Sequence, residues 1–205
     1  MFNMVITLPA AYAMSRKEFA LRKVLNAYFV FTMFFNGGII ATYICIRDLS
    51  LINNRLVFIV AFGLNVYNLI ITRSFFEQSL PEELREAALI DGCGHWRYFI
   101  SCVLPLSKAI IMVISLYYFV WHWNDFYMGL VYARDTKILP LQNILRTILL
   151  SNQTNSGGGI DFFHLSLQEQ IKYASIIVAS LPLLVIYPFL QKFFAKGVML
   201  GAVKG

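Results

Sequence analysis

The chain has 205 residues, of which 59% are hydrophobic and 14% charged, so its polar surface is too small to cover a soluble globule of this size. Its formal net charge of +6 does not indicate nucleic-acid binding, because the Lys and Arg residues are scattered between apolar runs. A membrane protein is the expected class, and the 16% aromatic content suits positions facing lipid and the headgroup boundary. The 3 cysteines, an odd number, predict buried thiols and no disulfide framework.

Four apolar stretches are long enough to cross a bilayer, which takes about 20 residues per helix. They cover residues 24–46, 56–76, 107–130 and 173–194, and they predict an all-α integral membrane protein with several spans. Residues 1–14 are also apolar, but as a helix they would reach only about 21 Å. We expect them to be a partial span of a chain that is incomplete at its N-terminus, because a half-helix in lipid would leave backbone groups unsatisfied.

The distribution of basic residues predicts an orientation in the membrane. The connection over residues 15–23 carries four basic side chains, which the positive-inside tendency places in the cytoplasm. Alternation then puts residues 77–106 and the C-terminus inside, and residues 47–55 and the external loop 131–172 outside. By this assignment eleven of the 17 Lys and Arg residues lie inside and six outside.

The inside segment 77–106 has the pattern of two helices joined by a turn. Ser79 and Glu82 have the spacing of a capping box, and the acidic residues of the first turns suit the positive end of a helix. Gly92 supplies a left-handed stop. A second, apolar helix runs from His95 to Leu104 and is expected to end at Pro105.

The first of these helices presents a predicted docking face with two alanines at its centre, small enough to let another protein approach closely. The residues of this face, at helical spacing, are Leu84, Ala87, Ala88 and Asp91. The plain alternative is a solvated amphipathic connector between two spans.

One set of residues in this segment resembles the EAA loop of permease subunits from binding-protein-dependent ABC importers. The residues that carry the resemblance are Glu86, Ala87, Ala88, Asp91, Gly92, Phe99, Leu104, Pro105 and Leu106. The order of the spans, residues 138–142 and the ending 196–205 are similar to the carbohydrate-uptake branch, closest to the maltose-permease-like oligosaccharide and polysaccharide-fragment permeases. The resemblance covers essentially the whole chain, although family members normally have a further N-terminal span.

The resemblance implies a carbohydrate importer of the bacterial plasma membrane that works by alternating access. Its implied partners are a cytoplasmic ABC ATPase dimer, a second permease subunit and an extracellular or periplasmic sugar-binding protein. The implied coupling residues are Glu86, Ala87, Ala88, Asp91 and Gly92, to which we add Leu84 and Pro105. The chain has no Gly-rich phosphate loop ending in Lys and Ser or Thr, so we expect ATP on the partner and no cofactor here.

Polar and aromatic residues within the spans predict a substrate pathway. Aromatic rings beside amide and carboxylate groups suit a sugar, whose ring face stacks while its hydroxyls form hydrogen bonds. The residues that could line such a pathway are Asn65, Asn68, Tyr118, Trp121, Asn124 and Asp125. Interfacial anchoring and helix packing explain the same residues and stay open as alternatives.

Two other functions have weaker support in the sequence. An ion- or proton-coupled carrier could use His122 and Asp125 as a relay. A membrane enzyme could act around Asp91, Cys93 and His95. A zinc site in that region is not expected, because Cys93, His95 and Cys102 lack the paired spacing of structural zinc ligands.

Overall fold

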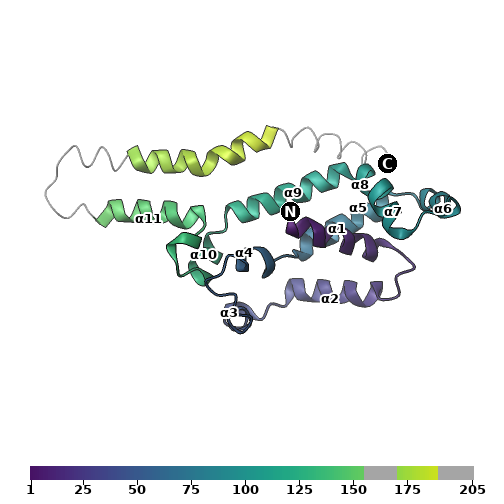
Figure 1. The fold of residues 1–205 in the computed structure, drawn as a ribbon, viewed down its shortest axis with the longest axis horizontal. Coiled ribbons are helices and arrows are strands. Elements are labelled where there is room, and N and C mark those ends of the chain that lie inside the picture. Colours follow the sequence, from purple (N-terminus) through teal and green to yellow (C-terminus); the bar gives the residue numbers. More distant parts are fainter. Residues whose placement is uncertain (155–169, 189–205) are drawn as a thin grey trace.

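The computed structural model describes residues 1–154 and 170–188, and these residues form helices and connections without any strand (Figure 1). The labelled helices are α1 (Phe2–Ser15), α2 (Arg22–Phe34), α3 (Gly38–Asp48), α4 (Val57–Val60), α5 (Val66–Ser79), α6 (Glu82–Ile90), α7 (His95–Tyr98), α8 (Leu104–Leu106), α9 (Lys108–Trp123), α10 (Phe126–Tyr132) and α11 (Leu141–Thr154). A π-helical segment, Phe99–Val103, joins α7 to α8, and a 3-10 turn covers Thr136–Ile138. A further helix covers Gln170–Pro188.

Helix α1 forms the centre of the structure and packs chiefly against α5, with α2, α4 and α9 also in contact. Its side chains are apolar on most of its circumference, as expected for a helix with neighbours on several sides. Ala11, Leu69 and Phe76 are completely buried between α1 and α5. Of the apolar residues 1–14, predicted to be a partial span, most of those from Leu8 onward contribute to the main hydrophobic core, whereas Met1, Phe2 and Val5 are exposed.

The stretch 24–46, predicted as one span, is not one helix. α2 and α3 are separate and meet at an angle of 116°. The break falls at Asn36, whose side-chain Oδ1 accepts a hydrogen bond of 3.0 Å from the backbone N–H of Gly38. Gly38, the first residue of α3, has φ +81°, a left-handed conformation that a glycine adopts without strain.

Two other predicted spans are also interrupted by polar residues. Within 56–76, the helix stops after α4 and restarts at α5, where the side chain of Asn65 accepts a hydrogen bond from the N–H of Asn68 and caps the new helix. Within 107–130, α9 ends at Trp123, and Asp125 occupies the N-cap position of α10. Both predictions of a single continuous helix were wrong, because side chains bond to the backbone at these breaks: Asn65 does so at the start of α5, and the Nδ2 atom of Asn124 donates a hydrogen bond of 3.0 Å to the carbonyl of Val120 at the end of α9.

One described helix, Gln170–Pro188, is long and apolar enough by itself to cross a membrane. Two bent pairs meet the same criterion if each is counted as one span: α2 with α3, and the helical run His95–Leu106 with α9, which meet at 83°. Residues 173–188 of the predicted span 173–194 lie within the helix Gln170–Pro188. The rest of that span, residues 189–194, and the C-terminus lie outside the described residues. The predicted external loop 131–172 contains the 14-residue helix α11.

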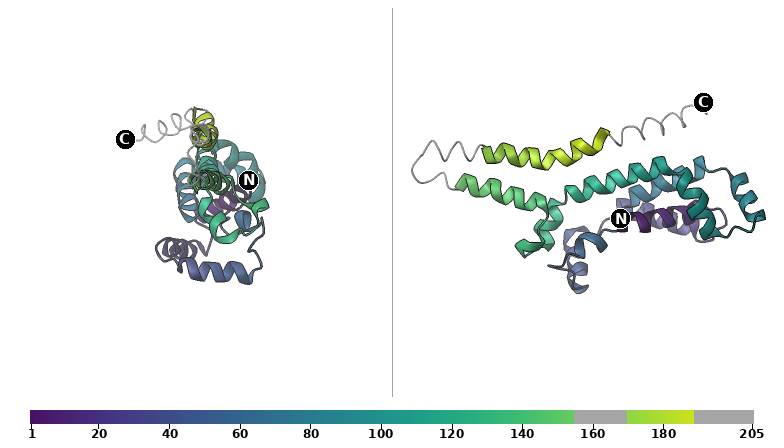
Figure 2. Two further views of the ribbon diagram at one scale, coloured as in Figure 1. Left: turned by 90° about the vertical axis from the view of Figure 1, so that its left-hand side faces the viewer. Right: turned by 45° about the horizontal axis from the view of Figure 1, so that its top comes forward.

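Many of the connections lie in two groups along an elongated molecule (Figure 1; right-hand view of Figure 2). In the group at the tip that carries α6, Lys17 lies 3.6 Å from Glu82, so the connection before α2 touches α6. In the group beside α3, α4 and α10, past which α11 extends, the Oδ1 atom of Asn53 accepts hydrogen bonds from the N–H groups of Arg134 and Asp135 at 3.0 and 2.8 Å. The two segments predicted inside thus meet in one group, and segments predicted outside meet in the other. Which end faces the cytoplasm stays a prediction.

Candidate coupling loop and candidate substrate cavities

Helix α6 lies at one tip of the molecule, directly after the chain leaves α5 (Figure 1). Pro81 is its N-cap residue, and Glu82 and Glu83 in its first turn complement the positive end of the helix. The predicted capping box was wrong: Ser79 is the last residue of α5, and no side chain caps α6.

The end of α6 agrees with the sequence prediction for Gly92. Gly92 has φ +70°, and its N–H donates to the carbonyl of Leu89 at 3.0 Å. The N–H of Cys93 donates to the carbonyl of Ala88 at 2.8 Å. These two bonds form a Schellman motif, which turns the chain sharply from α6 toward α7.

The predicted docking face is only partly exposed. Glu86, Ala87 and Asp91 are exposed, and the side chain of Leu84 is 38% exposed. Ala88 is half-buried and packs against the main core, so its place on the docking face was predicted wrongly. The outward face is therefore turned about the helix axis toward a residue that was not singled out, Ile90, which is 87% exposed.

The inward face of α6 is held by an ion pair that the sequence analysis missed. The guanidinium of Arg85 donates two hydrogen bonds to the carboxylate of Glu18 in the connection before α2, one of them 2.6 Å long. The Arg85 side chain is only 10% exposed and also lies 3.3 Å from Glu82. Those hydrogen bonds hold the pKa of Glu18 below its ordinary value and raise the pKa of Arg85.

A longer helical run carries the chain from the Gly92 turn into α9. It includes α7, the π-helical segment and α8, with Pro105 inside α8. Pro105 cannot donate a backbone hydrogen bond and crowds the carbonyl four residues earlier, which accounts for the wider π-helical turns just before it. The run ends at Leu106, one residue beyond the predicted end, and Ser107 at the corner is completely buried.

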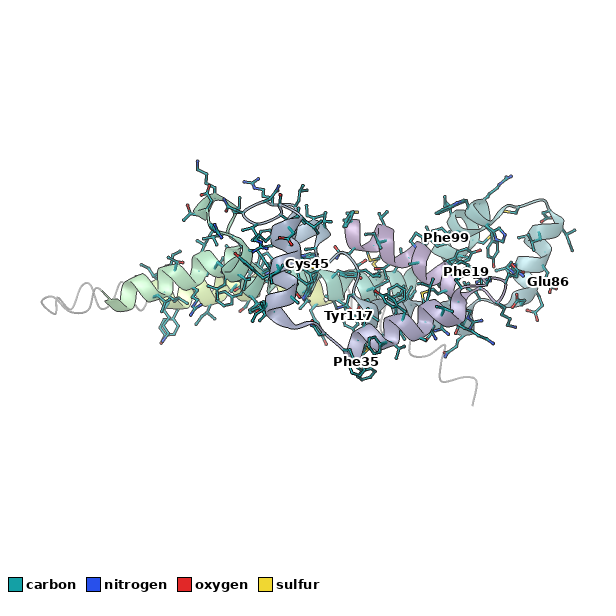
Figure 3. The ribbon with its side chains drawn as sticks, turned by 90° about the horizontal axis from the view of Figure 1, so that it is seen from below. Phe19, Phe35, Cys45, Glu86, Phe99 and Tyr117 are labelled. Atoms are coloured by element: carbon teal, nitrogen blue, oxygen red, sulfur yellow. The ribbon has the colours of Figure 1, made fainter. Side chains whose placement is uncertain are left out.

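The six residues predicted for a substrate pathway line two neighbouring cavities, and Trp121 contributes to both. The cavity of about 220 Å³ is lined by Asn65, Tyr67, Asn68, Tyr117, Tyr118 and Trp121. The cavity of about 340 Å³ contains Trp121, Asn124 and Asp125 among its lining residues, with Asn36 and Tyr127 on other parts of its wall. Figure 3 shows Tyr117 in the middle part of the molecule, away from the end that carries Glu86.

Several of these residues also have structural contacts. The hydroxyl of Tyr118 lies 2.7 Å from the hydroxyl of Thr7 on α1, and it accepts a hydrogen bond of 3.1 Å from the N–H of Asn65. Asn68 is 4% exposed. Tyr118 therefore joins α9 to α1 and to the start of α5, whereas the ring of Trp121 packs edge-on against Phe62 with centroids 6.2 Å apart.

The structure does not bring together the residues of the proposed proton relay. The Nε2 atom of His122 lies 3.0 Å from Oδ1 of Asn3, and His122 lines a cavity with residues of α1. Asp125 lines a different cavity, beside α3 and α10. Among residues 1–154 and 170–188, no group of three or more His, Cys, Asp or Glu side chains is placed to hold a metal ion.

A helical membrane subunit with a helix-turn-helix loop at one end is the class that these features define. The chain belongs to the family described as binding-protein-dependent transport system inner membrane component, which matches residues 4–200. It is therefore an inner-membrane subunit of a transport system.

Two curated relatives come from Bacillus subtilis (strain 168). Protein LplC is 40% identical over 204 residues, covering 99% of this chain and 69% of LplC. The polygalacturonan/rhamnogalacturonan transport system permease protein YtcP is 39% identical over 205 residues, covering 99% of this chain and 71% of YtcP. A solved crystal structure, that of a bacterial ABC transporter involved in the import of the acidic polysaccharide alginate, superposes with a TM-score of 0.83 at 29% identity. The superposition covers 94% of this chain and 69% of the chain in the alginate transporter.

Proposed function

We propose that this chain is the transmembrane subunit of an ATP-driven importer for a carbohydrate of the oligosaccharide class. It takes part in alternating access and performs no chemistry of its own. ATP is bound and hydrolysed by a partner, and this chain binds no cofactor. Its partners are a cytoplasmic ABC ATPase dimer, a second permease subunit and an extracellular or periplasmic sugar-binding protein, and its C-terminus lies in the cytoplasm.

The observation that carries the proposal is the exposed helix α6 at the tip of a chain of this family. Glu86 and Ala87 face solvent, and the Schellman turn at Gly92 joins the helix firmly to the run that leads into α9. A small exposed side chain such as Ala87 permits close contact with a partner surface, and the ion pair between Arg85 and Glu18 fixes the helix from behind. A push on α6 would thus be passed to α1, α2 and α9 together.

The substrate class is supported by the relatives and by the cavities. YtcP is named for polygalacturonan and rhamnogalacturonan transport, and the superposed transporter imports alginate. In this chain Trp121 and Tyr127 provide aromatic faces, and Asn36 and Asn124 provide amides, in one cavity of about 340 Å³. This mixture suits the stacking and hydrogen-bonding faces of a sugar.

The test uses the complete transporter reconstituted in liposomes with its binding protein, and measures uptake of labelled neutral and uronate oligosaccharides. We expect uptake to require ATP on the ATPase side and to survive a protonophore. Uptake that continues without ATP but stops with the protonophore would instead establish the ion-coupled carrier.

A matched pair of variants tests the docking of α6. Ala87→Trp places a bulky ring on the exposed docking face, whereas Ala20→Trp places the same ring on an exposed alanine of the connection before α2. We expect only Ala87→Trp to lose the ATPase during purification. Normal co-purification and uptake with Ala87→Trp would refute docking through this face.

A further inference from the structure

A further cavity lies beside the coupling loop and takes no part in the proposed transport path. It has a volume of about 490 Å³ and opens between the end of α1, the connection that follows it, and the start of the run into α9. The residues lining it are Pro9, Tyr12, Ala13, Arg16, Glu18, Phe19, His95, Trp96 and Phe99. Figure 3 shows Phe19 and Phe99 close to each other, toward the end that carries Glu86.

The polar lining of this cavity centres on Tyr12 and Arg16. The Tyr12 hydroxyl and the Nε atom of Arg16 are buried and have no hydrogen-bond partner among the described residues. The Arg16 guanidinium lies over the Tyr12 ring, 4.8 Å from its centroid. The one carboxylate in the lining, that of Glu18, already accepts two hydrogen bonds from Arg85. The carboxylate of Glu18 is thus paired with Arg85, and a ligand with anionic oxygens would neutralise the charge of Arg16.

The other side of the cavity is apolar and reaches the molecular surface. Pro9, Ala13 and Phe99 form its wall, and the ring of Trp96 is 69% exposed at its edge. Trp is favoured at the headgroup level of a bilayer, where one part of the ring is apolar and the other wet. A ligand that fits must combine an anionic group with an apolar chain.

We infer that this cavity binds one anionic phospholipid of the cytoplasmic leaflet. The phosphate lies against the Arg16 guanidinium, and an acyl chain lies along Pro9 and Phe99 toward the bilayer core. The predicted orientation puts this end of α1 at the cytoplasmic boundary, where anionic lipids attract basic side chains. Because the same lipid contacts α1 and α7, its presence would stabilise the coupling loop next to its docking helix.

The experiment titrates the detergent-purified complete transporter with phosphatidylglycerol and counts bound lipids by native mass spectrometry. We expect Arg16→Gln to weaken the first bound phosphatidylglycerol by about tenfold or more, as for the loss of one charge-assisted hydrogen bond. Arg16→Lys should retain part of the affinity. The matched control is Lys23→Gln, which removes the same charge from an exposed residue of α2 outside the cavity, and it should change binding less than about twofold.

Two further arms separate a lipid from a free phosphate compound. Trp96→Ala removes an exposed ring, so the protein should fold, and the affinity for phosphatidylglycerol should fall. Glycerol 3-phosphate, which has the phosphate without acyl chains, should not compete at millimolar concentration. Equal lipid binding by Arg16→Gln and the parent protein, or full competition by glycerol 3-phosphate, would overturn the inference. Neither readout depends on which substrate the transporter carries.

Discussion

Gly92 offers the sharpest test of the coupling loop, because a substitution there strains the backbone without causing a side-chain clash. Its φ of +70° is a left-handed conformation, and a Cβ added there would meet no heavy atom within 4 Å. The cost of Gly92→Val therefore arises from the backbone alone, at about 1–3 kcal/mol. Gly94, two residues later, is equally open but has φ −67°, so Gly94→Val should cost little.

The free-energy penalty of Gly92→Val predicts how much of the native turn is lost. A penalty of about 1–3 kcal/mol lowers the population of the native turn by about 5-fold to 150-fold relative to alternatives, since each 1.4 kcal/mol is a factor of ten. The spans themselves should still insert, because the turn lies outside the apolar core. We expect Gly92→Val to be present in the membrane at near-normal amount, with uptake and substrate-stimulated ATP hydrolysis lost and less ATPase co-purified.

The controls make the reasoning refutable. Gly94→Val should transport normally, and Gly92→Asn should retain more activity than Gly92→Val, because Asn tolerates the left-handed region better than a β-branched residue. Full uptake by Gly92→Val, or an equal loss in Gly94→Val, would show that the left-handed turn does not matter for coupling.

Three more outcomes follow from contacts elsewhere in the chain. Tyr118→Phe removes the hydroxyl shared by α1 and α5 and should lower the free energy of unfolding by about 1–3 kcal/mol, whereas Tyr117→Phe, at a ring that is 40% exposed, should leave the thermal unfolding of the solubilised protein unchanged. Because hydrogen bonds from Arg85 hold the pKa of Glu18 below its ordinary 4.5, the ion pair is fully present above about pH 4.5 and is lost as the pH falls through the lowered value. Hydrogen exchange of α6, corrected for intrinsic rates, should then stay constant from pH 8 to pH 5, and a marked rise within that range would contradict the assignment. A cysteine placed at Lys137 should react with a membrane-impermeant reagent in intact cells, and labelling only after lysis would reverse the topology.

The sequence predicted the turn at Gly92 and the membrane class well, because both depend on local or compositional properties. A left-handed stop needs only a glycine after a helical pattern, and the Schellman bonds at Ala88 and Leu89 follow from it. The predicted spans failed at Asn36, Asn65 and Asn124 for one physical reason: hydropathy averages over a window, whereas a single side chain that bonds the backbone can interrupt a helix.

The ion pair between Arg85 and Glu18 could not be derived from local pattern. The two residues are 67 positions apart, and their pairing depends on how the connection before α2 folds back on α6. The one signal in the sequence for such a pair was Arg85, the single basic residue of an otherwise acidic helix. The same long-range packing turns Ala88 toward the core and leaves Ala87 exposed. Helical spacing alone does not distinguish these two alanines.

The corner at Ser107 would turn a movement of the coupling loop into a larger movement at the far end of α9. The run His95–Leu106 and α9 meet there at 83°, so they would act as the input arm and the output arm of an angled lever that pivots at Ser107. With 16 residues, α9 is about 24 Å long at 1.5 Å per residue, against about 18 Å for the 12-residue input arm. A turn of about 5° around the corner would move the far end of α9, at Trp123, by about 2 Å. Movement of the docking helix toward or away from the membrane would therefore reach the substrate cavities as a sideways displacement about one third larger, given arms of about 24 and 18 Å.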